Sequence, residues 1–71
     1  MNPSEIARLQ TYLRSTFDND GITLTAGKNA EAPTELSLDG EFLAVIYRDD
    51  EDGEISYSLH MTVLEEDLPA G

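Results

Sequence analysis

Apolar residues in the first 17 positions recur at the spacing of an amphipathic helix. Asn2 can cap the first free N–H groups, Pro3 suits the first helical position, and Glu5 stands where a capping-box acid belongs. The polar run 18–21, which ends in glycine, is a turn signal. The pattern predicts a helix over residues 2–17. Its apolar stripe consists of Ile6, Leu9, Leu13 and Phe17, with Tyr12 at the edge.

The rest of the chain alternates between apolar and polar residues, which is typical of strands with one buried face. Asp39 and Gly40 form a strong two-residue hairpin signal that joins two such segments, and an acidic loop joins two more. The sequence therefore predicts one α+β domain over 1–71, with the N-terminal helix packed on one face of a four-stranded antiparallel meander sheet. The predicted strands are 22–26, 34–38, 41–48 and 54–63, followed by a tail over 65–71.

The two hairpins also predict which residues face the core. A two-residue turn places Leu36 opposite Leu43, and an acidic loop closed by Arg48 and Glu54 sets the register of the last strand. Because side chains alternate along a strand, both hairpins assign the same face to the core. The residues expected there are Leu36, Leu38, Leu43, Val45, Tyr47, Ile55, Tyr57, Leu59 and Met61.

The same register leaves apolar side chains on the sheet face that has no helix. A sheet face in water is normally polar, so an apolar patch on it predicts a contact surface. We expect Phe42, Ala44, Ile46 and His60 to form this surface. Two alternatives stay open: the C-terminal tail folds back over Phe42, or the loop 49–53 closes differently and exchanges the two faces of the strand.

Charge narrows the class of partner. The chain carries 15 acidic and 4 basic residues, a net charge of -11. Binding to a phosphate backbone or to an anionic membrane requires clustered Lys and Arg, so neither is expected. Four acids crowd the predicted hairpin loop and are expected to steer or orient a basic partner. They are Asp49, Asp50, Glu51 and Asp52. An alternative is that the acidic surface imitates a nucleic acid and occupies a basic protein.

Catalytic equipment is scarce in this chain. It has no cysteine, which excludes disulfides, thiolate nucleophiles and zinc–thiolate sites. His60 is the only histidine, and it has no predicted acid to orient it. Placing Gly53 at the glycine of an EF-hand loop puts Arg48 and Leu59 at ligand positions, so the loop is not an EF-hand. We therefore expect no catalytic residue, metal site, cofactor or small-molecule substrate, unless an enzyme site is shared between subunits.

Several segments of the chain resemble one bacterial family. The segment 39–54, with its hairpin turn, apolar run and acidic loop, resembles small proteins about as long as this 71-residue chain. Those proteins are classed only as a domain of unknown function and occur mainly in alphaproteobacteria. The helix start at Pro3 and Glu5 and the stretch 61–68 resemble them too, whereas Ala44 stands where the family has glycine. The resemblance implies a stand-alone bacterial protein and no activity.

No basic start followed by an apolar run is visible in residues 1–10, and no apolar stretch is long enough to span a bilayer. A cytoplasmic location is therefore expected. The function predicted from the sequence is a non-enzymatic interaction module that binds a protein partner or forms a homodimer. It would use the apolar outer face and the acidic loop.

Overall fold

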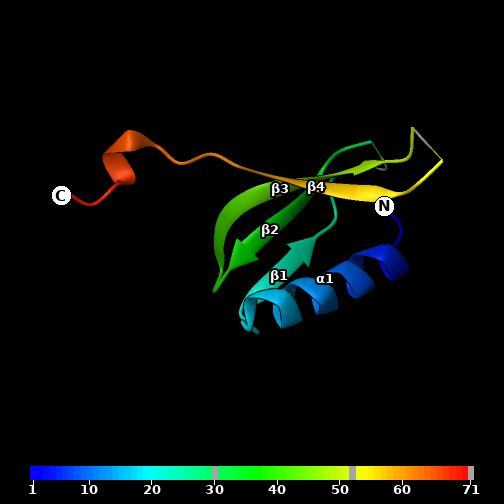
Figure 1. The fold of residues 1–71 in the computed structure, drawn as a ribbon, viewed down its shortest axis with the longest axis horizontal. Helices are drawn as coiled ribbons and strands as arrows, with labels where there is room; N and C mark the ends of the chain where they lie inside the picture. Colours follow the sequence, from blue (N-terminus) through cyan, green and yellow to red (C-terminus); the bar gives the residue numbers. More distant parts are fainter. Residues whose placement is uncertain (30, 52, 71) are drawn as a thin grey trace.

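The computed structural model describes residues 1–29, 31–51 and 53–70. Over this part of the chain it confirms the predicted fold class, one N-terminal helix and a four-stranded antiparallel meander sheet (Figure 1). The sheet order is β1-β2-β3-β4. The elements are α1 (Pro3–Phe17), β1 (Ile22–Thr25), β2 (Thr34–Leu38), β3 (Glu41–Asp49), β4 (Ser56–Met61) and a 3-10 turn, η1 (Glu65–Asp67).

Helix α1 begins and ends where its local sequence dictates. The Asn2 side chain accepts from the Glu5 N–H at 2.8 Å, and the Glu5 carboxylate accepts from the Asn2 N–H at 3.2 Å, which completes the capping box. Asp18 follows the helix in the left-handed conformation with φ 51°. The N–H of Asn19 then bonds the carbonyl of Arg14 at 2.9 Å and closes the last turn.

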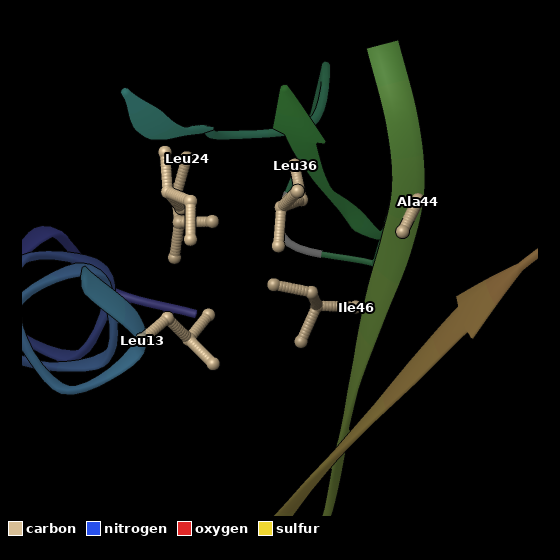
Figure 2. Close-up of a cluster of buried hydrophobic side chains, with 6 residues drawn as sticks. Leu13, Leu24, Leu36, Ala44 and Ile46 are labelled. Atoms are coloured by element: carbon tan, nitrogen blue, oxygen red, sulfur yellow. The ribbon is translucent and has the colours of Figure 1, made fainter. Parts of the chain in front are cut away.

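The core lies between α1 and one face of the sheet, which we call the inner face (Figure 2). Leu13 is the buried residue of α1, and it points toward side chains from three strands. Dispersion and the removal of apolar surface from water hold the helix on the sheet through this cluster. Its members are Leu13, Ile22, Leu24, Leu36, Ala44 and Ile46.

A β-bulge in β3 changes the register that the Asp39–Gly40 turn predicts. The turn pairs as expected, but the register shifts beyond it, so that Leu36 faces Ala44 rather than Leu43. One extra residue in a strand sends every later side chain to the opposite face. Ala44 and Ile46 therefore lie on the inner face, 5% and 1% exposed. The prediction that they form an outer contact surface is wrong.

The hairpin between β3 and β4 is also longer than predicted. Strand β3 continues to Asp49 and β4 begins at Ser56, so the connection is not closed by Arg48 and Glu54. Ile46 pairs with Leu59, so Leu59 lies on the inner face, as do Tyr57 and Met61, which alternate with it along β4. The prediction that Val45 and Tyr47 face the core is wrong as well. The loop does close differently, as the open alternative held, but it is the bulge that exchanges the faces of β3, and Leu59 and Met61 of β4 stay on the predicted face.

The C-terminal segment after Met61 leaves the sheet. It runs away from the helix and strands and carries η1 near its end (Figure 1). Its apolar side chains Val63, Leu64 and Leu68 are all more than half exposed, and Phe42 is 56% exposed. The alternative in which the tail folds back over Phe42 is therefore excluded.

Candidate functional site

The two edges of the sheet are treated differently by the fold. Strand β1 lies beside α1, whereas β4 lies at the far edge (Figure 1). On β1, the N–H of Leu24 donates to Gln10 Oε1 at 2.9 Å, and the carbonyl of Ile22 accepts from Arg14 Nε at 2.8 Å. Both side chains come from one face of α1 and cover the backbone groups that an edge strand would otherwise present to another chain. The β1 edge is therefore capped.

Removing one of these caps is expected to open the β1 edge. Gln10→Ala should lower the free energy of unfolding by about 1 kcal/mol, because the half-buried Leu24 amide loses its acceptor. Hydrogen exchange at the Leu24 amide should accelerate, and urea unfolding should report the loss of stability. Gln10→Glu keeps an acceptor oxygen and is the matched control. Unchanged exchange at Leu24 in the alanine variant would show that the cap does not protect this edge.

Strand β4 has an open outer edge. It pairs with β3 on one side, and no hydrogen bond among the described residues reaches its other side. The ten residues from Ile55 to Leu64 contain no Asp, Glu, Lys or Arg, although the chain carries 19 such residues elsewhere. Natural edge strands are usually protected by charges, prolines or a covering element. An uncharged, uncovered edge strand is therefore a candidate docking site.

An apolar groove adjoins this edge on the inner face. Because α1 packs beside β1, it leaves Leu59 and Met61 of β4 uncovered, 41% and 58% exposed. They border an open groove of about 390 Å³ that is also lined by Phe17, at the end of α1. Leu38 and Leu43 lie in the same groove. Apolar side chains that flank an open strand edge add side-chain contacts to the backbone pairing that the edge offers.

A polar network ties the other end of β4 to the start of α1. Arg48 and Tyr57 face each other across β3 and β4. The Tyr57 hydroxyl donates to Glu5 Oε2 at 2.7 Å, and Arg48 Nε donates to the same oxygen at 2.8 Å. Arg48 also bonds Asp50 at 2.9 Å. The N-terminal end of α1 is thereby fixed near the loop end of β4, and the groove opens toward the tail end.

This network holds the Glu5 carboxylate in its charged form. The Tyr57 hydroxyl, the Asn2 N–H and the Arg48 guanidinium donate to it and lower the pKa of Glu5 from 4.5 to about 2. The hydrogen bond between Tyr57 and Glu5 also raises the pKa of the Tyr57 hydroxyl. A carboxylate with so low a pKa and three donors is a poor general acid or base near neutral pH. Its role is to anchor the helix to β3 and β4.

Acid should release this anchor. The folded pKa of Glu5 lies below its ordinary value, so its contribution to stability is complete above pH 4.5 and is lost as the pH falls toward 2. Glu5→Gln should therefore unfold at lower urea than wild type at pH 7, and the two proteins should converge near pH 2. Tyr57→Phe removes the hydrogen bond that lowers the pKa of Glu5 most, so that pKa should rise. In the Tyr57→Phe protein, the effect of adding Glu5→Gln should therefore vanish at a higher pH than in wild type. A difference between Glu5→Gln and wild type that stayed constant from pH 7 to pH 2 would contradict the assignment.

Residues 5–67 of the chain match a family described as protein of unknown function DUF3126. The chain belongs to the DUF3126 family. The match confirms the resemblance to a domain of unknown function, and it spans the helix, all four strands and η1. No curated protein and no solved structure matches the chain. Membership in DUF3126 therefore brings no activity to this chain.

The residues predicted for an outer contact surface are not brought together in this member of DUF3126. Ala44 and Ile46 are in the core, whereas Phe42 and His60 are exposed on the outer face. The ring of His60 stands edge-on to that of Tyr47, with the centroids 5.0 Å apart. Of the four predicted residues, only Phe42 and His60 lie on that face, together with Val45 and Tyr47, which the sequence placed in the core.

The acidic residues predicted for one loop do not all lie in a loop, because β3 is longer than predicted. Asp49 is the last residue of this strand, and its carboxylate accepts from the Glu51 N–H at 3.0 Å. Asp50 is paired with Arg48, and Asp52 lies outside the described residues. No group of three metal-ligating side chains occurs among the residues that the structure describes, and none of the helices in that part of the chain could cross a bilayer.

Sequence reasoning missed the open edge because it placed Leu59 and Met61 in the core. They do lie on the inner face, but α1 does not reach them. The available signal was the run 55–64, which has no charged residue in a chain with a net charge of -11. An uncharged strand at the end of a meander is a candidate exposed edge even before its register is known.

Proposed function

We propose that this DUF3126 protein is a non-enzymatic protein–protein interaction module that takes up a strand of another polypeptide along the outer edge of β4. The observation that carries the proposal is the contrast between the two sheet edges. Gln10 and Arg14 cap the edge of β1, while the edge of β4 is uncharged and has no partner among the described residues. A fold that protects one edge and leaves the other available is suited to strand addition.

Two features of the β4 edge support this mode of binding. Added strands gain affinity from main-chain hydrogen bonds and specificity from alternate side chains. On β4 the alternate residues Leu59 and Met61 turn toward the groove, and Phe17 and Leu43 line it beyond them. The contact surface thus moves from the outer face expected from the sequence to the edge and the adjoining inner face.

Other functions receive less support from the geometry. A nucleic-acid mimic needs acidic residues spaced along a line. The longest exposed apolar segment here, residues 55–64, contains no acidic residue and cannot form part of such a line. An enzyme needs a titratable group free to exchange protons, whereas Glu5 is held ionised by three donors. His60 is engaged edge-on with Tyr47.

Position-specific photo-cross-linking tests the proposal. We would place p-benzoylphenylalanine at position 59, on the open edge strand, and in a matched protein at position 23, on the exposed face of the capped strand. Irradiation of cells that produce each protein should give an adduct of discrete mass from position 59 and none from position 23. Equal labelling at both positions, or none at either, would contradict docking at β4.

A further inference from the structure

The occupant of the β4 edge follows from the character of the edge itself. Resting on the proposed function, we infer that the strand taken up by β4 is β4 of a second copy of this chain. The two strands run antiparallel about a two-fold axis perpendicular to the sheet. Two four-stranded sheets then join into one continuous eight-stranded sheet, and the protein is a homodimer.

Charge favours a second copy over a basic partner at this strand. Each chain carries a net charge of -11, so two copies repel each other wherever acids meet. The run 55–64 is the longest stretch of the sequence without a charged residue, and it contains the whole of β4. Two copies can approach along this run without placing carboxylates opposite each other. A basic partner would find no acid on the strand with which to pair.

The alternation of β4 also makes it complementary to itself. A two-fold axis perpendicular to the sheet keeps both inner faces on the same side, so inner-face residues must pair with inner-face residues. Pairing Leu59 with Leu59 of the second copy places Tyr57 opposite Met61. On the outer face, Ser58 then lies opposite His60. Every pair on the inner face is apolar, and no pair joins like charges.

The dimer interface would draw on the edge of β4 and on the exposed side chains beside it. A standard interface buries about 800 Å² per partner, and the chain exposes 5598 Å² in total. The edge of β4 would supply part of this area. The rest would come from Leu59 and Met61 and from the tail residues Val63 and Leu64, which project beyond β4 with more than 40% exposure each. The groove beside β4 becomes a cleft shared by the two copies.

Single cysteines test the pairing directly, because the chain has none of its own. In Leu59→Cys the two sulfur atoms should lie across the two-fold axis, and mild oxidation should convert most of the protein to a disulfide-linked dimer. Thr23→Cys, on the capped strand, is the matched control and should remain monomeric on a non-reducing gel. Equal cross-linking of the two variants, or none of Leu59→Cys, would overturn the pairing.

Solution mass tests the dimer without an added thiol. Sedimentation of wild type should give the mass of two chains. Leu59→Lys and Met61→Lys should sediment with the mass of one chain, and their far-UV circular dichroism should show that they remain folded. In Leu59→Lys like charges would face each other across the axis, and in Met61→Lys a charge would face Tyr57 of the second copy. Either change should raise the dissociation constant about 100-fold or more. The dimer should also tighten between about 0.05 and about 0.5 M salt, because salt screens acidic repulsion. Weakening with salt would overturn self-pairing.

The two proposals fail in different ways. A wild type that sediments as a monomer, together with a position-59 adduct to a different protein, would overturn the dimer and leave the interaction module standing. A monomer with no adduct at position 59 would overturn both. An adduct with the mass of two chains would support both.

Discussion

Ile46→Ala is expected to destabilise the protein by about 3 kcal/mol, because it removes three carbon atoms from a fully packed site. Ile46 is 1% exposed and is the largest side chain that the core encloses completely. A chain of 71 residues has a stability of roughly 4–10 kcal/mol, so this one change should cost about half of it. Urea unfolding at equilibrium should show a lower midpoint with an unchanged slope.

Phe42→Ala is the matched control for this prediction. Phe42 is a larger side chain four positions earlier on β3, but it is 56% exposed. Its replacement should change the free energy of unfolding by about 0.5 kcal/mol or less. The register predicted from the turn alone places Ile46 in water. An Ile46→Ala variant that is as stable as Phe42→Ala would therefore show that the bulge in β3 is absent.

The fold was predictable because its signals are local. The capping box of Asn2 and Glu5, the alternation of the strands and the Asp39–Gly40 turn each act within a few residues, and all appear in the structure. The faces of β3 were not predictable in the same way. They depend on one extra residue opposite Leu36, and the pairing of β4 depends in turn on the length of the acidic loop. A turn fixes where pairing starts, whereas packing decides where a bulge interrupts it.

The candidate site was hidden for a related reason. Arg14 does not belong to the apolar stripe predicted for α1, yet it reaches across to the backbone of β1. Sequence reasoning places Leu59 in the core, yet α1 leaves Leu59 uncovered. The contact of Arg14 with β1 and the exposure of Leu59 both depend on where the helix lies on the sheet. Neither is part of a repeating pattern in the sequence. The helix has one position on the sheet, and that position determines which edge is covered and which is open.

Leu13→Ala is the second change with a large expected effect, again about 3 kcal/mol. Of the residues of α1, all of which the structure describes, Leu13 alone is buried, and it points into the cluster formed by β1, β2 and β3 (Figure 2). Removing its side chain leaves a cavity beneath the helix. Thermal unfolding should move down by roughly 12–24 °C for a domain of this size. Tyr12→Ala, at an exposed neighbouring position, should move it little.

The consequence of Leu13→Ala should reach the β1 edge as well. The caps from Gln10 and Arg14 depend on the helix being seated, so a loosened α1 frees the backbone groups of Leu24 and Ile22. Hydrogen exchange at Leu24 should then accelerate before the rest of the sheet unfolds. With both edges open, the variant should form higher oligomers at high concentration, whereas wild type should stop at two copies. Exchange at Leu24 that rose only with global unfolding would show that the helix and β1 edge are not coupled through Leu13.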